Sequence, residues 1–142
     1  MIGYLDTSVF VPLLGEEPTT PACLDFWFTA DAVTSCRIVY VEAAAALARA
    51  ERGGRLSTPL HRRARVMLDE LFVELEVIDV DQALVTAAAD LAHRLRLRGY
   101  DAVHCAAAAQ LDEPDLVAAS GDRHLLAAMR ELGIATYDPA AS

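Results

Sequence analysis

The chain has 142 residues, a length that one domain of ordinary size accounts for, and we expect a single domain over residues 1–142. Hydrophobic residues make up 54% of the chain, which excludes an intrinsically disordered protein, and no apolar run reaches the roughly 18 residues of a membrane helix. The formal net charge is −9, so any contact with nucleic acid has to rely on local positive charge.

The cysteines and the first residues indicate the compartment. Cys23, Cys36 and Cys105 are widely spaced and form no CxxC pair, which argues against a disulfide framework and against a structural zinc site. No basic segment precedes the first apolar run, and Asp6 interrupts that run, so we predict no signal peptide. We therefore expect a cytoplasmic protein.

Short apolar strands alternate with helices along the chain. In chain order we predict a strand at 2–5, helices at 8–14 and 21–29, a strand at 33–35, helices at 38–52 and 59–75, a strand at 76–80, helices at 82–98 and 101–110, a strand at 115–119, a helix at 122–132 and a strand at 134–137. The predicted N-caps are Thr20, Ser57 or Thr58, and Asp81. The glycines predicted to end helices are Gly53, Gly99 and Gly133. This alternation predicts an α/β fold of three α/β/α layers around a short, mainly parallel sheet.

Four acidic residues stand where such a sheet is expected to bind a ligand. Asp6 directly follows the first predicted strand, and Asp122 follows the fourth by three residues. Both therefore lie at carboxyl ends of strands, where open parallel sheets form their ligand crevice. Asp101 opens a predicted helix, and Glu42 lies among apolar residues of another, where burying a lone carboxylate would be costly.

Carboxylates that converge on one point repel each other, and a divalent cation removes that repulsion. Hard oxygen ligands without a His or Cys cluster favour Mg²⁺ or Mn²⁺ over zinc, and such a site commonly serves phosphoryl chemistry. Each acid also has a simpler interpretation. Asp6, Asp101 and Asp122 could each cap a helix, and Glu42 could be a solvated helix position.

Four segments carry a recognisable pattern: Tyr4-Leu5-Asp6-Thr7-Ser8, Thr34-Ser35 with Glu42 seven residues on, Tyr100-Asp101-Ala102-Val103-His104-Cys105, and Ser120-Gly121-Asp122-Arg123-His124. In order, spacing and total length they resemble the PIN-domain family, and specifically its VapC-type toxins of bacterial toxin–antitoxin pairs. The resemblance covers nearly the whole chain. It implies a PIN-like fold and a metal-dependent endoribonuclease that a cognate VapB-type antitoxin holds inactive.

The resemblance also implies roles for the four acids. Asp6, Glu42, Asp101 and Asp122 match the acidic quartet of the family, which holds one or two Mg²⁺ or Mn²⁺ ions. In that family a metal-activated water attacks the phosphodiester in line and leaves 3′-hydroxyl and 5′-phosphate ends. By this resemblance Asp6 and Asp101 are direct ligands, Glu42 binds metal or orients the water, and Asp122 acts through water.

Two hydroxyl residues have implied roles as well. By resemblance, Thr7 and Ser120 orient a carboxylate or a bound water. Family members commonly carry Thr and then Asn before the last acid. Ser120 and Gly121 stand here instead, so the chain lacks any contact made by that Asn side chain.

Positive charge is concentrated in two stretches. Residues 49–65 hold six arginines and one acid, and three more arginines shortly precede Asp101. We predict that these arginine-rich turns border the cleft and bind phosphates, with contacts to RNA from Arg62, Arg63 and Arg65. The alternative is that they are solvated helix faces.

Other side chains leave several interpretations open. Trp27, with Phe26 and Phe28, could stack on bases, pack in the core or line an apolar groove, and the resemblance makes the antitoxin a candidate occupant of such a groove. His104 and His124 lie close to acids in the sequence, but packing is the simpler role for each, and neither joins the predicted metal ligands.

Other function classes fit the sequence less well. A haloacid dehalogenase-like phosphatase needs a second Asp where Ser8 stands, and both it and a receiver domain rely on a Lys, which this chain lacks. The remaining alternative is a catalytically inert PIN-fold interaction module, against which four mutually repelling acids argue. The resemblance, together with apolar and alanine-rich helix faces, leads us to expect a homodimer.

Overall fold

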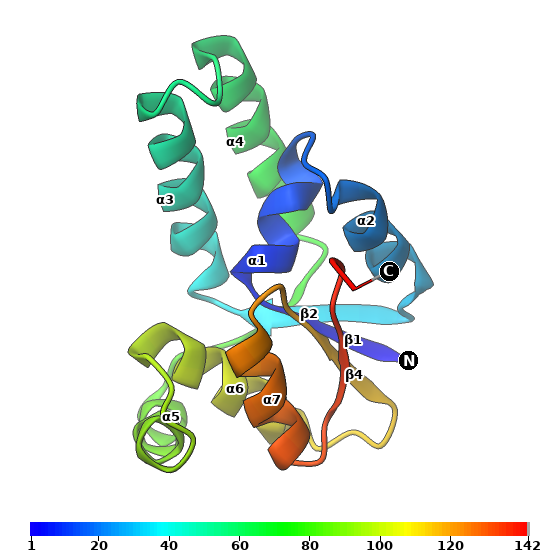
Figure 1. Ribbon diagram of the computed structural model, residues 1–142, viewed down its shortest axis with the longest axis vertical. Coiled ribbons are helices and arrows are strands. Elements are labelled where there is room, and N and C mark those ends of the chain that lie inside the picture. Colours follow the sequence, from blue (N-terminus) through cyan, green and yellow to red (C-terminus); the bar gives the residue numbers. More distant parts are fainter. Residues whose placement is uncertain (142) are drawn as a thin grey trace.

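The computed structural model describes residues 1–141, and a parallel sheet of five strands lies at its centre (Figure 1). The strands are β1 (Ile2–Leu5), β2 (Ala32–Cys36), β3 (Glu76–Ile78), β4 (Leu116–Ala119) and β5 (Ala135–Tyr137). All neighbours pair in parallel in the order β3-β2-β1-β4-β5. The predicted parallel sheet is confirmed, and its central strand β1 ends directly before Asp6.

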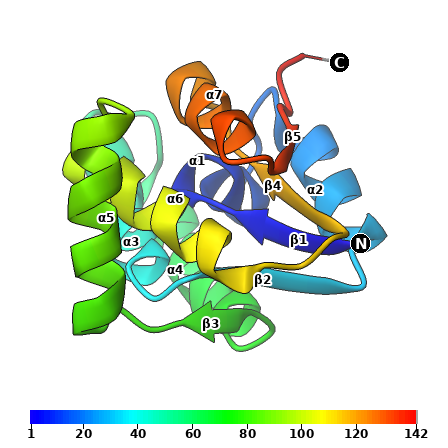
Figure 2. The ribbon, with the colours of Figure 1, turned by 90° about the horizontal axis from the view of Figure 1, so that it is seen from below.

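Helices cover both faces of the sheet (Figure 2). They are α1 (Thr7–Phe10), the 3₁₀ helix η1 (Val11–Leu14), α2 (Thr20–Thr29), α3 (Val39–Arg52), α4 (Thr58–Phe72), α5 (Gln82–Arg94), α6 (Gly99–Leu111) and α7 (Arg123–Glu131). One core cluster joins α1, η1, α2, α3 and α4 to one face, and a second joins α5, α6 and α7 to the other. The predicted α/β/α layering is therefore confirmed.

The layering follows from the alternation of side chains along each strand. Successive residues of a strand point to opposite faces, so Tyr4 belongs to one core cluster and Leu5 to the other. Both side chains are fully buried, since helices cover both faces. Central strands of this kind are continuous apolar runs, which is why β1 and β4 are apolar throughout.

Two of the predicted N-caps are confirmed and one is wrong. The Ser57 hydroxyl accepts a hydrogen bond from the backbone N–H of Leu60, and Asp81 accepts one from that of Leu84. Thr20 is instead the first residue of α2. Its hydroxyl accepts from the backbone N–H of Glu17 and donates to the carbonyl of Pro12, so it closes the preceding loop.

The predicted helix at 82–98 is too long, and its true end matters for the site. Helix α5 stops at Arg94, and Arg96 adopts a left-handed conformation with φ of 56°. Gly99 opens α6 instead of ending α5. Leu97 is buried in the core cluster, so the gain from burying this side chain favours a turn here over further helix. The turn places Arg98 at the N-cap of α6, one helical turn before Asp101.

Other boundaries shift by a few residues. Helix α4 ends at Phe72 instead of 75, because Leu75 turns into the core, and β3 stops at Ile78. Gly133 ends α7 as predicted, with φ of 82°. The three cysteines are all free and buried. Within residues 1–141, no helix combines the length and the apolar character needed to span a membrane.

Candidate functional site

The four predicted acids come from four separate segments at the carboxyl edge of the sheet. Asp6 follows β1, Glu42 lies in the first turn of α3, Asp101 in the first turn of α6, and Asp122 is the N-cap of α7. The starts of these helices gather beyond the ends of β1, β2 and β4 (Figure 1). The parallel topology thus unites residues that are up to 116 positions apart.

Asp6 is the most deeply buried of the four, with 5% of its surface exposed. The Ser8 hydroxyl donates to its Oδ1 at 2.6 Å, and the Ser120 hydroxyl donates to its Oδ2 at 2.6 Å. The backbone N–H of Gly121 in turn donates to Ser8 Oγ at 2.7 Å. Burial raises the pKa of Asp6, and the nearby His104 and the two hydroxyl bonds only partly offset that rise.

Glu42 is held by two donors that converge on one carboxylate oxygen. The Thr7 hydroxyl donates to Oε1 at 2.7 Å, and Nε2 of His104 lies 2.7 Å from the same atom. Burial alone would raise the pKa of Glu42. The bonds from His104 and Thr7 outweigh that effect and lower the pKa below its ordinary value. Glu42 is therefore ionised and oriented, and its interpretation as a solvated helix position is wrong.

Asp101 and Asp122 share one exposed arginine. Arg98 Nε lies 3.6 Å from Asp101 Oδ2, and its Nη2 lies 3.9 Å from Asp122 Oδ2. Burial raises the pKa of Asp101, as do the neighbouring charges of Asp122 and Glu42, whereas Arg98 lowers it. The arginine side chain is 87% exposed, so it is free to leave the two acids.

The two carboxylate oxygens of Asp122 have different partners, so this residue both caps a helix and belongs to the candidate site. Its Oδ1 accepts hydrogen bonds from the backbone N–H groups of His124 and Leu125, at 2.9 and 3.1 Å, and so caps α7. Its Oδ2 is the oxygen that faces Arg98. Asp6 is the N-cap residue of α1, but its side chain makes no capping bond there.

Sequence reasoning missed two residues of this site, His104 and Ser8. His104 is 2% exposed, and it bridges Glu42 and the hydroxyl of Tyr4 on β1. A position three residues after Asp101 on a helix lies on the same side, and that spacing was the available signal. Ser8 lies two residues after Asp6 in the first motif. The hydroxyls of Thr7 and Ser120 contact Glu42 and Asp6, as an orienting role would require.

The arginines predicted to contact RNA do not line the pocket beside the acids. Arg62, Arg63 and Arg65 belong to the first half of α4, near the tip of the hairpin formed by α3 and α4 (Figure 1). The pocket beside the acids is lined by Glu42, Arg98, Gly99, Tyr100, Asp101 and Val103. Arg98 is therefore the arginine at the acids, and RNA binding by the α4 arginines stays a prediction.

The donor set fits a hard divalent cation, although its side chains are turned to protein partners. Among residues 1–141, no three His, Cys, Asp or Glu side chains converge closely enough to hold one ion as they stand. Asp6 is engaged by serines, Glu42 by Thr7 and His104, and the remaining two acids by Arg98. Arg98 balances negative charge that a cation would also balance, and carboxylate oxygens are the ligands that Mg²⁺ and Mn²⁺ prefer.

Replacing Asp101 with Asn should raise the melting temperature of the metal-free protein at pH 7 by a few degrees. Because the folded-state pKa of Asp101 is raised above its ordinary value of 3.8, its stabilising contribution is complete below that value. The contribution is lost as pH rises through the folded-state pKa, and a neutral Asn avoids the loss. Thermal unfolding in EDTA, from below pH 3.8 up to pH 7, measures the difference in melting temperature between Asp101→Asn and the wild type. Asp90→Asn, at an exposed position, is the control. An Asp101→Asn protein no more stable than the wild type at pH 7 would contradict this account.

Comparisons with known proteins agree with this fold. The PIN domain model matches residues 3–132. The chain is 34% identical to Ribonuclease VapC45 of Mycobacterium tuberculosis over 122 residues, which cover 86% of this chain and 85% of that protein.

Two solved structures share the fold. VapBC2 from Rickettsia felis, bound to a promoter DNA fragment, superposes with a TM-score of 0.68 at 13% identity and covers 97% of this chain and 98% of its own. A toxin-antitoxin complex from Klebsiella pneumoniae superposes with a TM-score of 0.64 at 18% identity and covers 96% of this chain and 97% of its own. On the family match and the close relative, the chain belongs to the PIN-domain family, among the VapC ribonucleases.

Proposed function

We propose that this protein is a cytoplasmic endoribonuclease toxin that hydrolyses RNA phosphodiesters with Mg²⁺ or Mn²⁺ and is held inactive by a VapB-type antitoxin. The observation that carries the proposal is the meeting of four acids from four segments at one edge of the sheet, each already oriented by a protein donor. The similarity to a protein named a ribonuclease supports RNA as the substrate.

The roles proposed for the four acids are those that the family resemblance implies. Asp6 and Asp101 would hold the ion directly, Glu42 would bind it or orient the water, and Asp122 would act through water. When bound, the ion supplies an acidified water and neutralises charge on the phosphate. Ser8 and Ser120 hold both oxygens of Asp6, which keeps this buried carboxylate in one orientation.

Arg98 would contact the substrate. In the free protein this exposed side chain lies against Asp101 and Asp122. With the charge of the two acids compensated by a bound cation, the guanidinium of Arg98 would be free beside the pocket, where it could bind a phosphate through two parallel hydrogen bonds. Binding of RNA near a chain of net charge −9 depends on such local positive charge.

The inert interaction module remains the alternative function. Burial of Asp6, and burial of Asp101 beside the charges of Asp122 and Glu42, raise the pKa of both acids and so carry an electrostatic cost that a binding module has no use for. That cost is the reason for preferring an enzyme.

An apolar groove between α2 and α4 is the site we propose for the antitoxin. Its volume is about 790 Å³, and its lining includes Leu24, Trp27, Phe28, Leu60 and Met67. Trp27 is only 8% exposed and belongs to the core, whereas Phe28 is 79% exposed and supplies the aromatic surface. The lining carries two arginines, Arg55 and Arg63, against one acid, Glu16, and this excess of positive charge favours a partner segment with apolar and acidic side chains. The match to a toxin-antitoxin complex supports such a partner.

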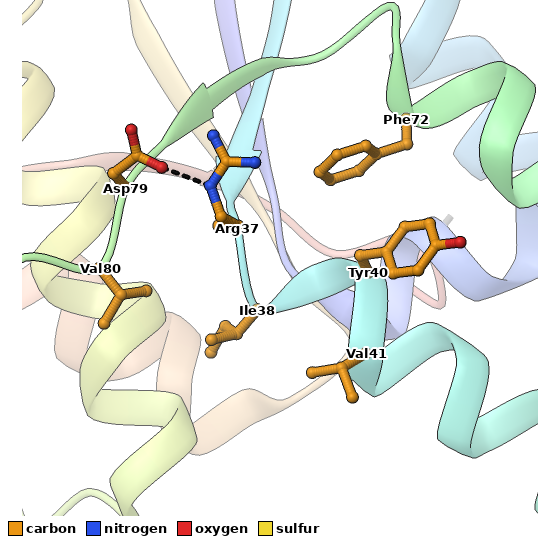
Figure 3. A pocket seen from close by; sticks show the side chains of 7 residues that line it. All are labelled: Arg37, Ile38, Tyr40, Val41, Phe72, Asp79 and Val80. Carbon is orange, nitrogen blue, oxygen red and sulfur yellow. Dashed lines mark hydrogen bonds and ion pairs between the residues drawn. The ribbon is translucent and has the colours of Figure 1, made fainter.

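A second apolar depression supports the expected homodimer. It has a volume of about 770 Å³ and is lined by Arg37, Ile38, Tyr40, Val41, Phe72, Asp79 and Val80 (Figure 3). The rings of Tyr40 and Phe72 meet edge to face, and Arg37 pairs with Asp79 at the border. Val41 is 61% exposed, and exposed aliphatic side chains beside aromatic rings are typical of protein interfaces.

Purified protein free of antitoxin should cleave total bacterial RNA into discrete products with Mn²⁺ or Mg²⁺, and EDTA should stop the reaction. Removing a residue behind a metal ligand typically reduces activity roughly 10–100-fold, and the cleavage rate of Asp101→Asn should fall by more than that. Asp90→Asn, an exposed site on α5, should cleave like the wild type. Undiminished cleavage by Asp101→Asn would disprove the assignment of the site. A metal ion at 100 times its Kd would stabilise the folded protein by about 2.7 kcal/mol. A folded protein that neither cleaves RNA nor gains stability from Mn²⁺ would therefore be the inert module.

Met67→Asp should weaken binding of the antitoxin at least tenfold, because it places a carboxylate on the apolar lining of the groove. Val66→Asp is the matched control, since Val66 is exposed on the same helix but does not line the groove. Titration of each variant with antitoxin purified from the wild-type complex gives the two dissociation constants. Equal constants for the two variants would place the antitoxin elsewhere.

Val41→Arg should shift the protein from dimer to monomer in sedimentation velocity, because it puts a charge into the depression of Figure 3. Val73→Arg provides the comparison: Val73 is also highly exposed but lies outside this depression. A dimer that survives Val41→Arg, or a wild type that is monomeric at all concentrations, would refute this interface.

A further inference from the structure

A line of buried hydrogen bonds runs from the central strand to the edge of the candidate site. Tyr4 on β1 is fully buried, and its hydroxyl lies 2.7 Å from Nδ1 of His104 on α6. Nε2 of the same imidazole lies 2.7 Å from Oε1 of Glu42 on α3. The imidazole therefore uses both ring nitrogens, and it links three elements that meet only in the folded protein.

The chemistry of the carboxylate sets the direction of the bond to Glu42. An ionised carboxylate only accepts hydrogen bonds, so the proton has to reside on Nε2 of His104. The tyrosine hydroxyl contacts the opposite nitrogen and prevents the ring from turning over. Tyr4 and His104 also meet edge to face, with ring centroids 5.9 Å apart, which fixes the plane of the imidazole.

Both donors to Glu42 use the same oxygen. Thr7 Oγ1 and His104 Nε2 each lie 2.7 Å from Oε1. Within the described residues 1–141, Oε2 makes no hydrogen bond to the protein. Glu42 lines the same pocket as Asp101. One oxygen is thus committed to the protein, and the other is left for a ligand.

We propose that His104 is a positioning residue: its Nε2–H holds Glu42 Oε1 so that Oε2 stays available to the metal or its water, and Tyr4 holds the imidazole from behind. This inference rests on the proposed metal-dependent function and deepens it. It assigns the buried histidine a role beyond filling the core between α6 and the sheet. Partners of this kind behind a metal ligand fix its orientation, and their loss commonly reduces metal affinity or activity 10–100-fold.

Two amide substitutions distinguish positioning from packing. Counted from Cβ, the amide nitrogen of Gln corresponds to Nε2 of histidine, and that of Asn corresponds to Nδ1. His104→Gln therefore keeps a donor within reach of Glu42, and His104→Asn loses it, although both variants remove the ring. Calorimetric titration with Mn²⁺ should show affinity within about threefold of the wild type for His104→Gln, and a loss of about 10–100-fold for His104→Asn. Single-turnover RNA cleavage should show the same order in rate.

The outcomes separate this inference from the proposed function. Equal Mn²⁺ affinities in the Gln and Asn variants, with a wild type that binds Mn²⁺, would overturn the positioning role alone. A wild type that binds no Mn²⁺ and cleaves no RNA would overturn the proposed function, and this inference with it.

A measurement on the wild type covers the case in which neither variant folds. Nitrogen-15 NMR of labelled histidine should show the His104 proton on Nε2, with a resonance that moves in Glu42→Gln. A proton on Nδ1 alone would overturn the inference.

Discussion

The partial burial of carboxylates at one edge of the sheet is the constraint on which the rest of this site depends. Asp6 is almost completely buried, and Asp101 lies in the field of both Asp122 and Glu42, so the fold holds negative charge where water screens it poorly. The protein compensates with local donors: two serine hydroxyls at Asp6, Thr7 and His104 at Glu42, and Arg98 between the other two acids. A divalent cation would compensate the same charges more completely.

The doubly covered sheet makes this concentration of charge possible. Two apolar clusters enclose β1 and β4 from both faces, so the edge of the sheet can hold unfavourable groups while the core supplies the stability of the fold. Because all five strands run parallel, they all end at the same edge, and the starts of α1, α3, α6 and α7 meet there. Backbone N–H groups at such helix starts carry partial positive charge, which favours acids at these positions.

The acids and the two apolar depressions lie on different parts of the described chain. The acids occupy one edge of the sheet, the groove between α2 and α4 opens among the helices of one face, and the depression of Figure 3 adjoins the start of α3. Glu42 connects the edge that holds the acids with the depression of Figure 3, since it directly follows Val41, which lines that depression, on α3. Arg55 and Arg63 line the groove and Arg98 lines the pocket, so the two arginine-rich stretches belong to different surfaces.

The sequence by itself determined the layered parallel fold and the family, and it predicted the four acids of the candidate site. Continuous apolar strands, capped helices and strand-end carboxylates are local patterns. The segment around Asp101 is the most specific part of the resemblance, and the match of the PIN domain model to residues 3–132 confirms the family. Local patterns could not reveal the end of α5, because the burial of Leu97 and the left-handed Arg96 are decided by packing against the rest of the chain.

Only the tertiary structure decided which acid each orienting side chain contacts, and that His104 and Ser8 are among them. His104 bridges Glu42 and Tyr4 across separations of 62 and 100 residues, and Ser120 reaches Asp6 across 114. The α4 arginines were predicted to border the cleft, yet none of them lines the pocket beside the acids. A hydrogen bond depends on distances of about 3 Å. The strand order and helix packing set such distances between remote segments, and composition or spacing along the chain does not encode them.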